Sequence, residues 1–322
     1  MSTTDVSKDS VEVSPPSDLS GGRRPGDSVF SVLSIGSGLL IFVTLAAVAI
    51  FLTSESLPAI RASHEVQGAG NGEFGLISYV APYVYGTVLA AAIALVIAIP
   101  ISVGIALFIS HYAPRRLSSV LGYMIDLLAA VPSVVYGLWG GVWLVPRLEP
   151  LYVFLNEYFG WIPLFAGDPT APMRNLASAS VVLAVMVLPI ITSVSREVFL
   201  QVPRLQEEAA LALGATRWEV IRTVVLPFGR SGVVAASMLG LGRALGETMA
   251  ILMILAPGAT FSLHILEVGR HQSIAANIAA RQAEASGIDM SLLIFTGLVL
   301  FVLTFIINAI ARWIVARSAV KS

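Results

Sequence analysis

The chain has 322 residues, of which 56% are hydrophobic and 12% are charged, and its mean hydropathy is +0.84. A soluble domain needs more polar surface than this, so the composition predicts a polytopic membrane protein. The net charge of −1 argues against a nucleic-acid-binding surface. The absence of cysteine excludes disulfides, thiolate metal sites and cysteine nucleophiles, and four scattered histidines offer little for a zinc site.

Three regions follow one another along the chain. Residues 1–27 are rich in Ser, Pro, Asp and Gly and predict a disordered tail. Residues 28–78 predict a first transmembrane helix, built on the apolar run Val29–Thr53, and an outer loop. That run is long enough to cross a hydrocarbon layer of ~30 Å. Residues 79–322 contain the remaining spans and form the predicted membrane core.

Five further spans are expected in this core, which gives an all-α fold with six transmembrane helices. They are Tyr79–Ser110, Ser118–Val145, Leu176–Val194, Ser231–Leu255 and Met290–Val315. The outer loop 146–174 is rich in aromatic residues that suit a membrane–water interface. The second outer loop, 257–290, is expected to contain a short helix around Ile274–Glu284.

The distribution of basic residues predicts the orientation. Of the 19 Lys and Arg residues, 13 lie on the side that holds both termini and the segment 203–228, and five lie on the opposite side. By the positive-inside rule, both termini of this multi-pass chain are expected to be cytoplasmic.

The polar stretch 203–228 interrupts the apolar pattern. Good helix formers predict a helix that ends at Gly214, because glycine favours the left-handed C-terminal cap. Thr216, followed three residues later by Glu219, is the pattern of a capping box, so a second helix is expected to begin there. Pro227 is expected to end that helix.

The sequence from Glu208 to Pro227 reads EAALALGATRWEVIRTVVLP. Ala209 and Ala210 leave a bare surface that another protein can approach closely. With Gly214 and the final proline in register, this spacing resembles the cytoplasmic coupling loop of ABC-importer permeases, apart from one Val where the family has Ile. The resemblance implies a type I, MetI-like permease fold whose loop docks on an ATP-hydrolysing subunit. The alternative is an ordinary amphipathic loop between two membrane helices.

Two membrane runs narrow the family. LAAVPSVVYGLWG at 128–140 and GLGRALGETMA at 240–250 resemble the permeases of Pst-type phosphate importers, the PstC-type subunit more than the PstA-type subunit. The resemblance implies a PstA-like permease partner, two ATP-binding subunits and an extracytoplasmic phosphate-binding protein. ATP and Mg would be bound by the ATPase, so no cofactor is expected in this chain. The alternative substrate is another oxyanion: molybdate, tungstate or sulfate.

Arg243 and Glu247 are the principal candidates for a substrate path. Arg243 is 12 residues into the predicted span that begins at Ser231, so at ~1.5 Å per residue it lies ~18 Å deep. A lone arginine at that depth costs at least ~2.5–3.5 kcal/mol. Glu247, one turn away, is its expected partner. The two residues either form a buried ion pair that fixes packing or line the path of an anion. Ser133 and Tyr136 offer hydroxyls to a substrate or to another helix.

Two other classes of protein are set aside. Gly229-Arg230-Ser231-Gly232 matches the Gly-x-Ser-Gly motif of rhomboid-type intramembrane serine proteases. The downstream histidines His264 and His271 fall in the outer loop, far from the cytoplasmic Ser231, so no base is available. A channel would have no use for a coupling loop. The chain also lacks a phosphate-cradling Gly-x-x-x-x-Gly-Lys loop and is not expected to hydrolyse ATP itself.

Overall fold

A computed structural model describes residues 25–62 and 75–319. The chain divides into two compact units, Met1–Ile50 and Phe51–Ser322. Residues 1–24 of the predicted tail and residues 63–74 of the first outer loop lie outside the described residues. The first helix, α1, begins at Pro25, so the predicted first span is part of a longer helix.

The described residues contain helices and no named strand. The helices of the first half are α1 (Pro25–Arg61), α2 (Leu76–Leu107), α3 (Arg115–Ala129), α4 (Ser133–Trp139), α5 (Val145–Phe159) and α6 (Leu176–Leu200). Those of the second half are α7 (Arg204–Ala212), α8 (Arg217–Val220), α9 (Leu226–Leu245), α10 (Met249–Ile254), α11 (Ile274–Arg281) and α12 (Ile288–Ala319). Three π-helical turns join some of them: η1 (Phe108–Tyr112), η2 (Gly140–Leu144) and η3 (Ile221–Val225).

The membrane architecture agrees with the predicted all-helical fold. Five helical segments of the described residues are long and apolar enough to cross a membrane, and a sixth span is obtained if one bent helix pair counts as a single span. Pro82 and Pro100 lie within α2 without dividing it. The short helix expected in the second outer loop is α11.

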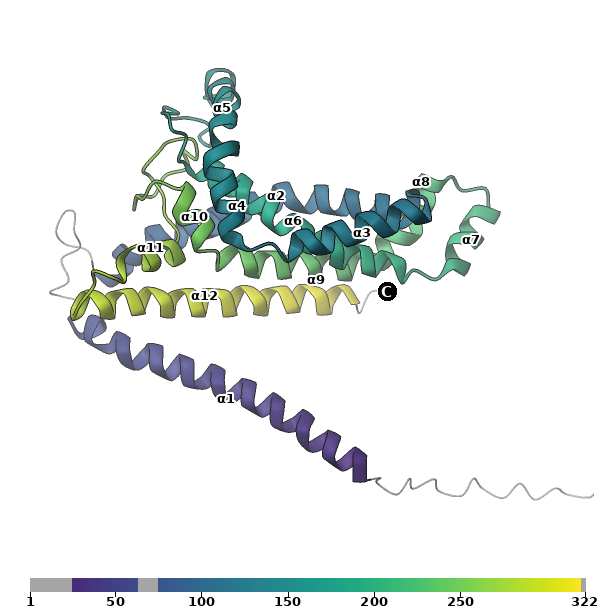
Figure 1. The fold of residues 1–322 in the computed structure, drawn as a ribbon, viewed down its shortest axis with the longest axis horizontal. Helices are drawn as coiled ribbons and strands as arrows, with labels where there is room; N and C mark the ends of the chain where they lie inside the picture. The colour runs from purple at the N-terminus through teal and green to yellow at the C-terminus, as the bar shows by residue number, and fades with distance from the viewer. Residues whose placement is uncertain (1–24, 63–74, 320–322) are drawn as a thin grey trace, which may run out of the picture. The chain divides into compact units, whose positions relative to one another are not determined.

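α6 forms the centre of the second unit, because both α2 and α9 pack along it (Figure 1). The contact face of α2 is a stripe of alanines, of which Ala90, Ala94 and Ala98 are at most 2% exposed. Small side chains let membrane helices approach closely, so packing rather than polar pairing holds this core together. Ser102 adds one bond across the pair, donating to the Leu188 carbonyl at 3.2 Å.

The span predicted at Ser118–Val145 was wrong as a single helix. α3 ends at Ala129, and the helical segment that begins at Ser133 is bent from it by 92°, so that α5 stands across the direction of α3 in Figure 1. Pro132 is the cause, because a proline disfavours helical geometry in the residue before it and cannot donate a helical hydrogen bond.

The span predicted at Ser231–Leu255 was also wrong as a single helix. α9 ends at Leu245 and α10 begins at Met249, with Gly246 in the cap position between them. Glycine weakens a helix, and the backbone here turns away from the α9 axis. The far end of α10 is closed by Arg174, which donates to the carbonyls of Met253 and Ile254 at 3.4 and 3.3 Å.

The loop between α10 and α11 is fastened to the ends of the membrane helices. Asn175 accepts a hydrogen bond from the Ser178 amide, which caps α6, and donates to the Leu266 carbonyl at 2.9 Å. On α2, the Thr87 hydroxyl accepts from the Ile274 amide at 3.0 Å. The neighbouring Gly86 lies directly against the backbone of Gln272, where a Cβ atom would collide with the carbonyl oxygen.

We expect Gly86→Ala to lower the thermal unfolding temperature of the detergent-solubilised protein. The added methyl group must push the loop off α2, which costs about 1–3 kcal/mol. Gly104→Ala is the matched control, because Gly104 is on the same helix, a Cβ atom at its position would meet no neighbour within 4 Å, and alanine favours helix there. Equal unfolding temperatures for the two variants would contradict this packing.

Candidate functional site

The two helix breaks meet inside the second unit. α4, which follows the first break, packs against α10, which follows the second. The contact is tight at Gly137, where a Cβ atom would lie 2.8 Å from the Cα atom of Ala250. The two membrane runs that the sequence singled out, 128–140 and 240–250, are therefore brought together, although a long stretch of chain separates them.

Arg243 and Glu247 do not form the ion pair expected from their spacing. Neither takes part in the ion pairs found among the described residues. Because α9 ends before Glu247, the two residues are not on successive turns of one helix. The Glu247 Oε1 atom instead accepts from the Ala250 amide at 3.0 Å and caps α10, while Arg243 lies in the last turn of α9. Each charge therefore sits at the helix end that stabilises it.

Arg243 has no counter-charge in the part of the chain that the structure describes. Its side chain is half-buried, and its Nε atom is buried without a hydrogen-bond partner. An arginine inside a membrane needs an anion, a polar partner or a water-filled cavity. No hydrogen bond or ion pair within the described residues engages its donor groups.

Tyr136 and Ser133 lie on α4 beside this region. The buried Tyr136 hydroxyl donates to the Leu128 carbonyl at 2.9 Å and so bridges the bend between α3 and α4. Ser133 is half-buried and forms no hydrogen bond within the described ranges. Thr248 was not singled out from the sequence, yet it lies in the second break, where its hydroxyl donates to the Gly246 carbonyl at 3.2 Å. The only sequence feature that could have indicated Thr248 is its position next to Glu247.

The predicted bend of the segment 203–228 is confirmed. α7 ends before Gly214, whose φ of +88° is the left-handed conformation expected there. The capping box is complete: the Thr216 hydroxyl accepts from the Glu219 amide at 3.3 Å, and a carboxylate oxygen of Glu219 accepts from the Thr216 amide at 2.7 Å. Two short helices therefore flank a tight turn.

Pro227 does not end the second helix. Residues from Arg217 to Leu245 form one continuous helical segment, with Pro227 in the first turn of α9. The π-helical turn η3 rearranges the backbone hydrogen bonds just before it, and a missing N–H is tolerated in a first helical turn.

The turn exposes apolar side chains. Leu205 and Leu213 are 77% and 90% exposed, and Trp218 is 59% exposed. Glu208 and Ala209 are also exposed, and Ala210 is half-buried. Large apolar groups left in water mark a surface that another protein covers.

A polar cluster marks the loop between α10 and α11. Glu267 accepts a hydrogen bond from Arg270 at 2.6 Å and lies 3.3 Å from the Nδ1 atom of His264. The Arg270 hydrogen bond is the main reason that the pKa of Glu267 is lowered. Burial lowers the pKa of His271 on the same loop, so a neutral imidazole is favoured there. These pairs are internal to the loop.

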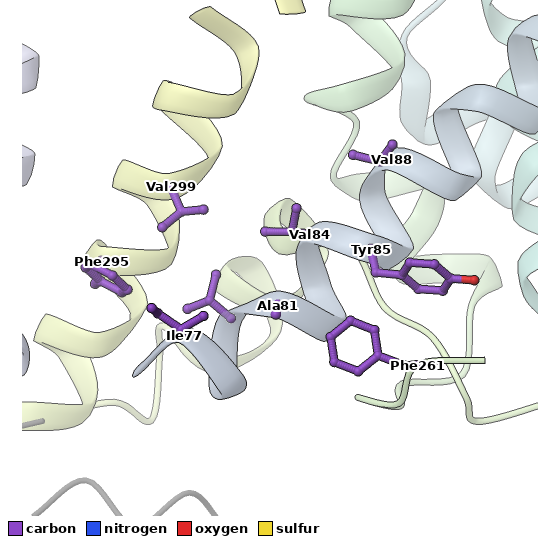
Figure 2. A pocket seen from close by; sticks show the side chains of 9 residues that line it. Ile77, Ala81, Val84, Tyr85, Val88, Phe261, Phe295 and Val299 are labelled. Atoms are coloured by element: carbon purple, nitrogen blue, oxygen red, sulfur yellow. The ribbon is translucent and has the colours of Figure 1, made fainter. Parts of the chain in front are cut away.

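The apolar groove in Figure 2 is a different kind of surface. It has a volume of about 490 Å³ and lies between the first turns of α2 and α12, with Phe261 from the loop beside it. Its lining residues are Ile77, Val80, Ala81, Val84, Tyr85, Val88, Phe261, Phe295 and Val299. Side chains of this kind suit hydrocarbon, so the groove is not the place for an anion.

A serine-protease arrangement is not formed. Ser231 is near the start of α9, whereas His264 and His271 follow α10, beyond the opposite end of that helix. The stretch of α9 after Ser231 is itself about 21 Å long at ~1.5 Å per residue. Nucleophile and base are therefore too far apart to exchange a proton.

Comparison with known proteins agrees with this geometry. The family model of the binding-protein-dependent transport system inner membrane component matches residues 98–320. A relative from Mycobacterium tuberculosis, the phosphate transport system permease protein PstC 2, is 47% identical over 92% of this chain and 93% of its own length. The PstC protein of Xylella fastidiosa is 40% identical over 88% and 90%.

A solved structure shares the fold. A chain of a bacterial ABC transporter involved in the import of the acidic polysaccharide alginate aligns with a TM-score of 0.58 and 16% identity, covering 91% of this chain and 98% of that one. At this identity the likeness shows the fold alone. The family match and the named relatives show that the chain is an ABC-importer permease, a transporter subunit and not an enzyme. Within that class, the chain belongs to the PstC family of phosphate transport system permease proteins.

We expect Gly214→Ala to loosen the turn between α7 and α8. An alanine at a left-handed φ costs about 1–2 kcal/mol, and no neighbour lies within 4 Å to add a clash. Amide hydrogen exchange in residues 204–220 should therefore be roughly five- to thirtyfold faster. Gly214→Asn is the control, because asparagine tolerates this conformation. Equal exchange in the two variants would show that the turn does not depend on its glycine.

Proposed function

We propose that this chain is the membrane-spanning permease subunit of an ATP-driven phosphate importer. The proposal rests on one observation above all: Arg243 is an arginine in a membrane helix to which the described residues offer no counter-charge. An arriving oxyanion supplies that charge. The relatives named as phosphate transport permeases support phosphate as the anion.

In this mechanism Arg243 receives phosphate through its forked donors. A guanidinium matches two oxygens of one anion at once, which gives both binding strength and orientation. Glu247 supplies selectivity. Its Oε1 atom is engaged with α10, so Oε2 is the atom left to accept a hydrogen bond from a protonated phosphate oxygen. Sulfate has no proton at neutral pH, so the same carboxylate repels it. Ser133, Tyr136 and Thr248 complete the polar lining of the path.

The subunit works in an assembly. The exposed turn at 203–228, with Glu208, Ala209 and Ala210, docks on one of two ATP-binding subunits, which bind the ATP and Mg. A PstA-like permease completes the path, and an extracytoplasmic phosphate-binding protein delivers the anion to the outer segments between α1 and α2, between α5 and α6, and between α10 and α12. Both termini lie in the cytoplasm, and the chain is a multi-pass protein of the bacterial inner membrane.

Alternating access follows from the two breaks. When ATP binding closes the ATPase dimer, the turn at 203–228 moves and the membrane helices reorient. The breaks at Pro132 and Gly246 are the points at which this reorientation changes the fewest backbone hydrogen bonds. α4 and α10 then move together, because Gly137 and Ala250 leave no gap between them.

Uptake of labelled phosphate is the direct test, with sulfate and molybdate measured in parallel. The cells compared are ones that lack this chain and ones to which it has been returned. We expect the loss and the restoration to concern phosphate uptake alone. Restoration of sulfate or molybdate uptake instead would support the permease function and show that phosphate is not its substrate.

We expect Arg243→Lys to reduce phosphate uptake by about tenfold to a hundredfold at equal membrane abundance, because lysine keeps the charge and loses the fork that binds two oxygens, worth roughly 1.5–3 kcal/mol. Arg230→Lys is the matched control, since Arg230 is an exposed arginine near the other end of the same helix. Normal initial uptake rates in Arg243→Lys would show that Arg243 does not contact the anion.

A further inference from the structure

The C-terminal end of α2 is joined to α3 through a π-helical turn and a side-chain hydrogen bond. After Leu107 the helix continues as the π-helical turn η1, which closes with the Ala113 amide donating to the Phe108 carbonyl at 2.8 Å. The Ser118 hydroxyl in the first turn of α3 donates to the Ile109 carbonyl, also at 2.8 Å. The turn η1 therefore joins α2 to α3, and any force on it reaches both helices.

His111 projects from this turn toward α7. Its Nδ1 atom lies 2.7 Å from the Ser110 hydroxyl, and its Nε2 atom lies 3.6 Å from a carboxylate oxygen of Glu207. The side chains are 14% and 27% exposed, so the contact is partly shielded from water. A pair in such a position is screened less than one on an open surface.

The hydrogen bonds around the ring orient it. The Ser110 hydroxyl also lies 2.8 Å from the Ala106 carbonyl, an acceptor that takes the hydroxyl proton. The hydrogen bond between Ser110 and Nδ1 fixes the plane of the ring. Ser110 thus holds the ring so that Nε2 faces the carboxylate.

This contact is the polar connection between α7 and a membrane-spanning helix. Of the ion pairs found in residues 25–62 and 75–319, it alone joins α7 to another element. No side chain of α7 is buried, and its main packing partners are α8 and η3, the first part of the helical segment that continues into α9. Apart from this pair, α7 is held by that packing and by its chain connections.

We propose that the pair His111–Glu207 is the link through which displacement of α7 reaches α2. The pair consists of positioning residues, which act on the transport path through the helices and touch no substrate. A movement of α7 pulls on η1 through this contact, and η1 transmits it to α2, which packs along α6, and to α3. The inference rests on the proposed function, because it takes α7 to be the part that an ATPase moves.

A role in which the pair His111–Glu207 only stabilises the turn predicts a different result from a role in which the pair transmits movement. If the pair only stabilised the turn, its loss would reduce the amount of assembled transporter and leave the ATP used per phosphate unchanged. If it transmits movement, its loss lets the ATPase cycle without moving the helices. The ratio of ATP hydrolysed to phosphate transported then rises, and this ratio does not depend on how much transporter is present.

The test uses the complete transporter, with its ATPase, partner permease and binding protein, reconstituted in proteoliposomes. We expect Glu207→Gln and His111→Gln each to raise the ATP hydrolysed per phosphate transported by about two- to fivefold, as suits a partly shielded pair. The double variant should be no worse than either single one, because the two changes remove the same contact. His111→Lys should keep the wild-type ratio, since it places a cation opposite Glu207.

Glu157→Gln is the matched control, because it removes an exposed carboxylate on α5, away from the turn at 203–228. The link would be overturned by an unchanged ratio of ATP hydrolysed to phosphate transported in both single variants, or by additive effects in the double variant. In that case, phosphate uptake by the wild type would still support the proposed function. A wild-type transporter that hydrolyses ATP without importing phosphate would instead overturn the proposed function, and with it the link.

Discussion

Breaking a helix inside a bilayer leaves backbone N–H and C=O groups where no water can satisfy them, and this constraint governs the interior of the second unit. The chain interrupts helices twice, at 130–132 and at 246–248, and in each case side chains take over the missing backbone bonds. Tyr136 donates to the end of α3 and Glu247 accepts from the start of α10. Arg174 donates to the carbonyls at the other end of α10. The main role of these polar side chains is therefore to satisfy the backbone N–H and C=O groups that the helix breaks leave without partners.

This view separates Arg243 from its neighbours. Tyr136, Glu247 and Thr248 each have a hydrogen-bond partner on the backbone, and their presence is explained without a ligand. Arg243 donates to no backbone carbonyl within the described residues, and its Nε atom is buried without a hydrogen-bond partner. A charge kept in a membrane helix without a hydrogen-bonded partner is costly, so the proposed contact with an anion is the simplest reason for its presence.

Sequence reasoning succeeded where the signals were local. The apolar runs of α1, α2, α6 and α12, the left-handed Gly214 and the capping box at Thr216 follow from neighbouring residues, and the structure contains all of them. It did not show how the helices turn at the two breaks, because hydropathy describes composition and not direction: a run can stay apolar while the helix turns by 92°. The Arg243–Glu247 pairing failed for the same reason, since it assumed one continuous helix. The contact between His111 and Glu207 joins segments far apart in the chain, and no local pattern indicates it.

The exposure of the turn at 203–228 has a consequence for the fate of the chain before assembly. Leu205, Leu213 and Trp218 lie open to solvent as long as no other protein covers them. A copy that has entered the membrane without its partners therefore displays an apolar patch of the kind that chaperones and proteases recognise. Binding of a partner removes that patch and stabilises the subunit by mass action. Under the proposed function, the surface that passes on movement thus also reports whether the transporter is assembled, so that the amount of this subunit follows the supply of its partners.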